Sequence, residues 1–85
     1  MAFTSEEADK YLKQFTEFDW LTRNNTPWWT TSDVATNLGL GNAAVRAFCE
    51  RGEIEGAIFY GNRIGWRIPR HGLIIFLANL KQNGS

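Results

Sequence analysis

The sequence predicts a single small domain that is mainly α-helical and carries a β-hairpin. Two short helical patterns lie on either side of a glycine turn at Gly39, a glycine-punctuated pair of strand patterns follows over 57–68, and an amphipathic helical pattern precedes them. A chain of 85 residues leaves room for one hydrophobic core only. We therefore expect a helical extension over 1–28 and a core region over 29–82 that fold as one compact unit.

Charge and composition say more about the cellular compartment of the protein than about its function. Lys+Arg and Asp+Glu each number nine, so the net charge is zero and argues neither for nor against a nucleic-acid partner. Residues 1–29 are mildly acidic and 30–85 mildly basic, which is compatible with a small positive face. The single cysteine excludes an internal disulfide, no secretory signal is visible, and the longest apolar run, 73–78, is too short to span a bilayer. We therefore expect a cytoplasmic protein with no membrane partner.

The first predicted helix begins at a capping box. In Thr4-Ser5-Glu6-Glu7 the threonine hydroxyl can accept from a first-turn amide while Glu7 reaches back to the backbone of Thr4. Apolar residues then recur at three- and four-residue spacing, which predicts one helical stripe made of Ala8, Tyr11, Leu12, Phe15 and Phe18. Two roles stay open for this helix: a lid packed on the core, or a surface for dimerisation or another partner.

The central part of the chain predicts two helices joined by a tight turn. Thr30-Thr31-Ser32-Asp33 has the form of a capping box, and Gly39 fits the position after a helix end where positive φ is common. We expect Leu40 to be a buried plug in the turn, and Gly41 or Asn42 to cap a second helix that runs to about residue 51. The inner faces of the two helices are expected to hold Val34, Ala35 and Leu38 on the first and Val45, Phe48 and Cys49 on the second.

A hairpin and a last helix complete the predicted fold. Strand-like runs over 57–60 and 63–68 flank Gly61-Asn62, and glycine first in a two-residue loop is typical of a primed hairpin turn. Such a loop places Phe59 opposite Ile64 and Ala57 opposite Trp66. One face of the hairpin is then core and the other exposed; the core face holds Ala57, Phe59, Ile64, Trp66 and Ile68, and the exposed face Ile58, Tyr60, Arg63, Gly65 and Arg67. A short apolar helix over 73–80 is expected to close the core.

This order of elements is the layout of a helix-turn-helix with a wing, and its motifs resemble the excisionase and MerR-type winged helix-turn-helix domains of bacteria, phages and mobile elements. The opening Thr-x-x-(Glu/Asp)-x-Ala of those domains is matched by Thr30, Asp33 and Ala35, and their Leu-Gly-(Val/Leu) turn by residues 38–40. Three further matches are the end of the recognition helix at Glu50-Arg51-Gly52, the strand start at Gly56-Ala57 and the end of the wing at Trp66-Arg67-Ile68-Pro69. The resemblance covers about half of the chain and leaves the first 28 residues outside it.

The resemblance implies sequence-specific binding of double-stranded DNA by a small transcriptional regulator or a recombination directionality (excisionase-like) factor. The helix over 42–51 would enter the major groove, and the wing over 60–67 would hold the backbone or the minor groove. Partners would be double-stranded DNA, further copies that assemble cooperatively on it, and an integrase or another protein, in a bacterial or phage-infected cell. The alternative is a protein-interaction or phage packaging adaptor module on the same scaffold, favoured by the zero net charge, by Glu50 and by the alanines after Asn42.

Exposed polar residues of the two helices and the hairpin are the candidate DNA contacts. Asn42 can donate and accept at a base edge, and Arg46, one turn further along, can face the same groove or a phosphate. Arginines on the outer face of the wing can grip phosphates or enter a minor groove, and a helix that begins at Thr30 offers free amides to phosphate. Plainer roles stay open, namely helix capping for the threonines and Asn42 and ordinary solvent exposure for the arginines. The candidate set is Thr30, Thr31, Asn42, Ala43, Arg46, Tyr60, Asn62, Arg63, Arg67 and Arg70.

The other residues with useful chemistry predict neither catalysis nor a metal site. Cys49 shares a stripe with apolar neighbours and is expected to be a buried small hydrophobe. His71 has no ligand cluster at metal spacing, and no nucleophile-elbow, phosphate-loop or paired-carboxylate motif is visible, so we expect no enzyme, no metal and no cofactor. We expect Trp28, Trp29 and Trp66 in the core, with a base-stacking platform for single strands as the alternative.

Overall fold

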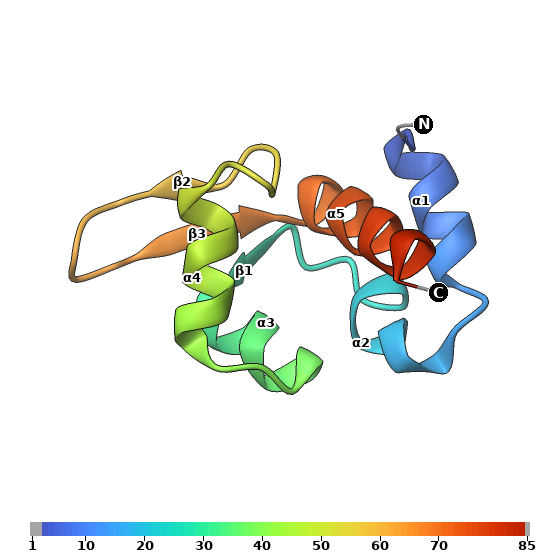
Figure 1. The fold of residues 1–85 in the computed structure, drawn as a ribbon, viewed down its shortest axis with the longest axis horizontal. Coiled ribbons are helices and arrows are strands. Elements are labelled where there is room, and N and C mark those ends of the chain that lie inside the picture. Colours follow the sequence, from blue (N-terminus) through green and yellow to red (C-terminus); the bar gives the residue numbers. More distant parts are fainter. Residues whose placement is uncertain (1–2, 85) are drawn as a thin grey trace.

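The computed structural model describes residues 3–84, which form a mainly helical molecule with a small three-stranded antiparallel sheet (Figure 1). The mainly helical class with a hairpin is therefore as predicted. Within the described range, no helix is long and apolar enough to cross a membrane. The elements in chain order are α1 (Ser5–Leu12), the 3-10 helix η1 (Thr16–Phe18), α2 (Asp19–Thr22), β1 (Trp28–Thr30), α3 (Thr31–Leu38), α4 (Asn42–Glu50), β2 (Ile58–Phe59), β3 (Trp66–Pro69) and α5 (Arg70–Asn83).

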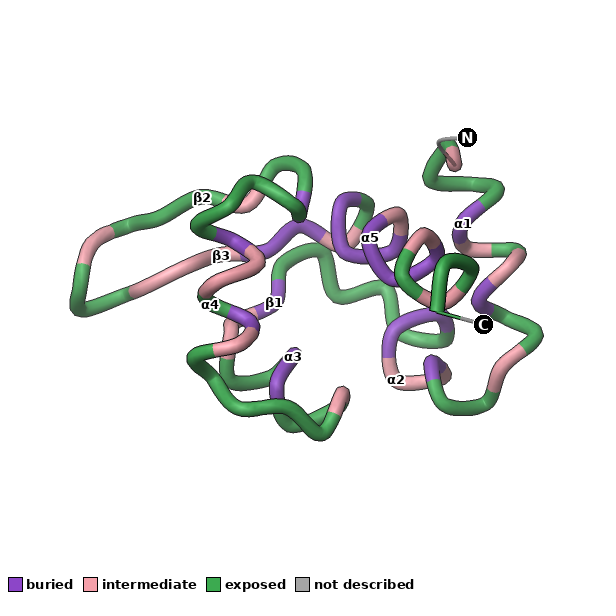
Figure 2. Tube along the Cα trace, viewed as in Figure 1, coloured by how far each residue is buried: buried purple, intermediate pink, exposed green. Residues whose placement is uncertain are grey.

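Helix α5 is the centre of the core. It spans 14 residues and is the longest element, whereas the sequence predicted a short helix. Helices α1 and α2 cover it on one side, and α3, α4 and the sheet lie on the other (Figure 1), so its buried positions run along most of its length (Figure 2). Leu80, predicted on the inner face, is exposed and lines a hollow between η1 and the α3–α4 turn. The fully buried large side chains are Leu12, Leu21, Val34, Val45, Ile68, Leu73, Ile74 and Leu77.

Helix α1 is shorter than its apolar pattern predicted. The capping box is confirmed, since Thr4 N donates to Glu7 Oε1 over 2.9 Å and Glu7 N donates to Thr4 Oγ1 over 3.2 Å. The helix ends at Leu12, however, and Phe15 is extended at φ −117° and ψ 120°. The chain turns back here, so that Phe18 is buried from η1 instead of from a continuous helix. The predicted stripe therefore identified residues that contact the core but not the break between them.

Helices α3 and α4 follow the predicted capping and turn chemistry, with one error. Asp33 N donates to Thr30 Oγ1 over 3.1 Å, and Gly39 ends α3 with φ 71°, a region in which a side chain is strained. Leu40 N then donates to the carbonyl of Ala35 over 2.9 Å. The Leu40 side chain is nevertheless exposed, so the prediction of a buried plug was wrong.

The sheet has the order β1-β3-β2, and the first of these strands was not predicted. Trp29 of β1 pairs with Ile68, which places both side chains in the core. In the hairpin Phe59 pairs with Trp66, two residues away from the predicted register. Gly61 and Gly65 both adopt positive φ (94° and 79°), and Gly65 N donates to the Gly61 carbonyl over 2.7 Å, which closes a longer loop than a two-residue turn.

The register shift changes the loop but keeps the paired strand residues on their predicted faces. Because side chains alternate with a period of two, a shift of two residues keeps Phe59 and Trp66 on one side and Tyr60 and Arg67 on the other. The hairpin extends beyond the helices (Figure 1), so Phe59 and Ile64 are exposed although the pattern predicted both in the core. Phe59 was placed wrongly because no helix covers the distal half of the hairpin, whereas Ile64 lies in the loop and lines the opposite face with Tyr60 and Arg67.

Two contacts fix the junction between β3 and α5. Arg70 N donates to the Pro27 carbonyl over 2.9 Å, which ties the start of α5 to the segment before β1. Gly72 lies against the backbone at Glu55, where an added Cβ would be 1.9 Å from the carbonyl oxygen. Only glycine fits this approach, so Gly72 sets how closely α5 packs on the loop between α4 and β2.

Candidate nucleic-acid interface

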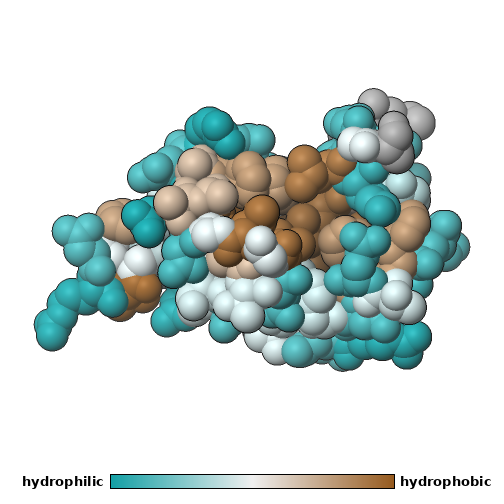
Figure 3. Space-filling view, turned by 60° about the horizontal axis from the view of Figure 1, so that its bottom comes forward, coloured by the Kyte–Doolittle hydropathy of each residue, from teal (hydrophilic) through white to brown (hydrophobic). Residues whose placement is uncertain are grey.

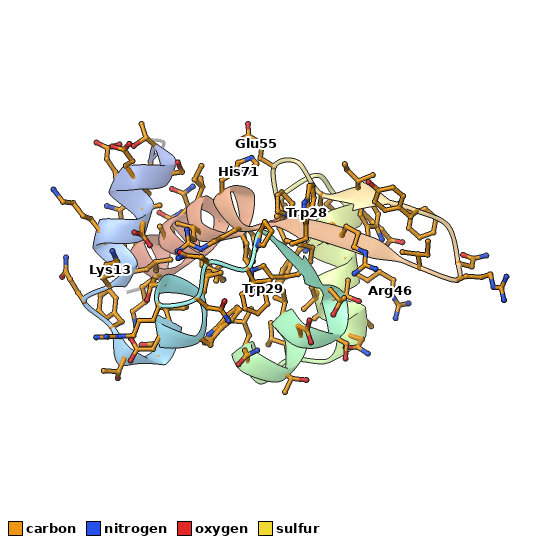
Figure 4. All side chains as sticks on the ribbon, turned by 180° about the vertical axis from the view of Figure 1, so that it is seen from behind. Lys13, Trp28, Trp29, Arg46, Glu55 and His71 are labelled. Atoms are coloured by element: carbon orange, nitrogen blue, oxygen red, sulfur yellow. The ribbon has the colours of Figure 1, made fainter. Side chains whose placement is uncertain are left out.

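The exposed side of α4 is short and carries one positive charge. Val45 and Cys49 are buried on its inner side, which leaves Asn42, Ala43 and Arg46 exposed at and after its first turn. Gly41 is the N-cap residue and makes no side-chain capping bond, so the structure does not use Asn42 as a cap. Arg46 leaves α4 beside the hairpin (Figure 4), and the exposed Glu50 lies one turn further along the same side.

An inner hollow of about 270 Å³ brings three predicted residues together. Thr31 reaches it from the start of α3, Arg46 from α4 and Asn62 from the hairpin loop. Its apolar wall is the pair Phe59 and Trp66, whose ring centroids are 5.3 Å apart. Three elements that are distant in sequence thus present a guanidinium, a hydroxyl and an amide around one concave surface, a set that can bind phosphate oxygens or base edges. We call this surface the inner hollow.

Tyr60 and Arg67, both predicted as DNA contacts, lie on the opposite face of the sheet. They line a second hollow of about 380 Å³ together with Trp28 and Ile64, which we call the outer hollow. Trp66 and Arg67 are consecutive residues of one strand, so their side chains point to opposite faces. The structure therefore divides the predicted wing contacts between two surfaces. Arg63 is exposed in the loop that joins β2 and β3.

Three arginines on α4 and the hairpin have no carboxylate partner among the described residues. Among residues 3–84, the guanidinium groups of Arg23, Arg51 and Arg70 lie within 4.0 Å of a carboxylate, and those of Arg46, Arg63 and Arg67 do not. No Asp or Glu lines either hollow. Although the net charge of the chain is zero, unpaired positive charge therefore collects on α4 and the hairpin.

Two of the residues predicted as DNA contacts, Thr30 and Arg70, make hydrogen bonds within the fold. The Thr30 hydroxyl is the N-cap acceptor of α3, which is the capping role that the sequence left open for it. The Arg70 side chain donates to the carbonyls of Asn24 and Leu21 over 2.9 and 3.2 Å, and contacts the carboxylate of Asp9 at 3.4 Å. Because these groups occupy its guanidinium within the N-terminal half of the fold, we leave Arg70 out of the candidate interface.

The sequence prediction missed aromatic residues of both hollows. Trp28 was expected in the core, yet it is exposed on the outer face while Trp29 is buried and Trp66 half-buried (Figure 4 labels Trp28 and Trp29). The available signal was the run Trp28-Trp29-Thr30 before a helix cap, because adjacent aromatic and β-branched residues favour a strand whose side chains alternate between faces.

The remaining chemistry-bearing groups lie outside the interface. Cys49 is buried, and its burial, with a smaller contribution from Glu50, raises the pKa of the thiol to about 11. Over residues 3–84, no group of three or more His, Cys, Asp or Glu side chains is placed to hold a metal ion. Comparisons with protein-family models, with curated proteins and with solved structures give no match to this chain.

Proposed function

We propose that the chain binds double-stranded DNA as a winged helix-turn-helix protein, with α4 in the major groove and the β2–β3 hairpin as the wing. The observation that carries the proposal is the gathering of the unpaired Arg46 and Arg63 around α4 and the hairpin, beside the polar groups of the inner hollow. Unpaired arginines near a short exposed helix face are the groups that neutralise phosphates, and they need no ion pair to be broken first.

Within this proposal the residues have separate roles. Arg46 and Asn42 are one turn apart on α4 and are the candidates for base contacts. Thr31 and Asn62 border the same hollow and are suited to phosphate oxygens, while Arg63 in the hairpin loop reaches the neighbouring backbone or minor groove. The biological role that fits is transcriptional control or control of recombination direction, as the sequence motifs implied.

A measurement of duplex-DNA affinity against salt concentration tests the proposal. If Arg46 and Arg63 each meet a phosphate, the slope of log K against log salt is about −1.8, at about −0.9 for each contact. Arg46→Ala then weakens binding and reduces the slope by about 0.9. Arg51→Ala is the matched control, because Arg51 ends the same helix but is already paired with Glu53 at 2.6 Å. Absence of duplex binding at about 50 mM salt, or equal effects of the two substitutions, would refute the proposal.

A second candidate function is protein binding, which an apolar groove on another face favours. The groove lies between η1, the α3–α4 turn and the end of α5, and Figure 3 shows it as a brown hollow in the middle of the face. The exposed Leu40 and Leu80 form part of its lining, with Phe18, Leu38 and Leu77 beneath them. Leu40→Ser and Leu80→Ser separate the two functions, because a DNA-binding role predicts unchanged duplex affinity in both variants.

A further inference from the structure

The residues that line the outer hollow take no part in the proposed duplex contacts. Trp28, Tyr60 and Ile64 are 45%, 54% and 56% exposed, and Arg67 lies among them. We propose that this hollow binds an unpaired base of single-stranded DNA, which stacks on Trp28 and Tyr60 while Arg67 holds the adjoining phosphate. The site is separate from the inner hollow and does not depend on duplex binding.

The sheet register explains why these rings are available. Trp28 and Arg67 point to the face opposite the buried pair Trp29 and Ile68, because Trp28 precedes Trp29 and Arg67 precedes Ile68 by one residue. Tyr60 joins them from the other side of β3, where its amide donates to the Gly65 carbonyl over 3.0 Å and continues the ladder beyond Phe59. The rings therefore come from both edges of the sheet and border one hollow over the central strand.

The chemistry of the hollow fits a base better than it fits a second copy of the chain. Every base presents two flat π faces, and aromatic side chains on a sheet bind such faces without reading their sequence. Arg67 has no carboxylate partner and no carboxylate lines the hollow, so the site complements a polyanion. A second copy is matched less well, because a two-fold contact centred on this hollow would bring two unpaired Arg67 guanidiniums together.

Binding to a short oligothymidylate and to an abasic oligomer of the same length tests the proposal. Both probes carry the same phosphates, so fluorescence anisotropy of labelled probes at low salt isolates the contribution of the bases. We expect the oligothymidylate to bind roughly 5- to 150-fold more tightly, the range for one to a few kcal/mol of stacking. Equal affinity for the two probes would overturn the proposal.

Substitutions at Tyr60 then locate the site. Tyr60→Thr is expected to lower the affinity for oligothymidylate toward that of the abasic probe, whereas Tyr60→Phe retains the ring and the affinity. Ile58→Thr is the control, since Ile58 is an exposed apolar residue of the same hairpin that does not line the hollow. Equal affinity of the Tyr60→Thr variant and the wild type would count against the site, as would a dimer in sedimentation that Tyr60→Thr dissociates.

Two substitutions, each measured with duplex DNA and with oligothymidylate, distinguish single-strand binding at the outer hollow from the proposed duplex binding. Arg46→Ala is expected to weaken duplex binding and to leave the oligothymidylate affinity unchanged, and Tyr60→Thr is expected to do the reverse. Thermal unfolding of each variant checks the fold, which Tyr60, with more than half of its side chain exposed, does not support from the core. If Arg46→Ala abolishes both activities, the outer hollow is not an independent site and the inference fails while the duplex proposal stands.

Discussion

Replacing Gly72 with alanine will destabilise the fold, although the same change stabilises most helices. Gly72 is the third residue of α5, where helix propensity alone favours alanine by about 1 kcal/mol. Against this gain, the new Cβ would be 1.9 Å from the Glu55 carbonyl oxygen, and real Cβ atoms essentially never approach closer than 3.0 Å. The atom it meets belongs to the backbone, so the helix or the loop before β2 must move. Overpacking typically costs about 1–3 kcal/mol, and a clash this close with a backbone atom belongs at the upper end of that range, so we expect a net loss of about 2 kcal/mol.

Thermal unfolding followed by circular dichroism measures this effect. A net loss of this size lowers Tm by roughly 8–16 °C in a domain of this length. Gly41→Ser is the control, because nothing lies within 4 Å of its added Cβ and serine is at least as good an N-cap residue as glycine. A Gly72→Ala variant with a raised Tm would show that α5 does not pack on Glu55 at this distance.

Three further predictions concern single residues. The buried Cys49 thiol will react slowly with thiol reagents at about pH 8. Its pKa is about 11 in the fold against 9.0 without burial, so the free energy of unfolding will fall between pH 9.0 and about 11, where the thiol of the unfolded chain ionises first. Cys49→Ser removes that pH dependence. Arg70→Met will cost about 1–3 kcal/mol in urea denaturation, because it removes the charged donor that binds the carbonyls of Leu21 and Asn24, whereas Arg63→Met will change stability by less than about 0.5 kcal/mol. Gly39→Ala will cost about 1–2 kcal/mol because its φ is 71°.

Local chemistry in the sequence predicted much of the fold. The capping residues Thr4 and Thr30 and the helix-ending Gly39 each act through contacts within five residues, so the chain itself contains the information. The break after Leu12 could not be predicted in this way, because the apolar spacing continues through it. The chain turns there so that later segments can pack on α5, which is a tertiary effect.

The candidate interface was harder to predict, because several of its aromatic and apolar residues were assigned to the core. Strand periodicity assigned Phe59 and Ile64 to the core because it assumes that each apolar face is covered. Trp28 was assigned to the core because large aromatic residues are commonly buried in small domains. Whether a helix covers a face depends on how far the hairpin extends, and that length was set by Gly61 and Gly65 together. The unpaired state of Arg46 also depends on which carboxylates lie nearby in the fold, since composition gave only a net charge of zero.

The hydrogen bonds of Arg70 hold the hairpin and α5 in one relative orientation at the point where they join. Strand β3 runs directly into α5, and at that point the Arg70 amide holds Pro27 while its guanidinium holds the carbonyls of α2. The backbone and the side chain of a single residue therefore set the direction in which β3 enters α5 relative to the N-terminal segment.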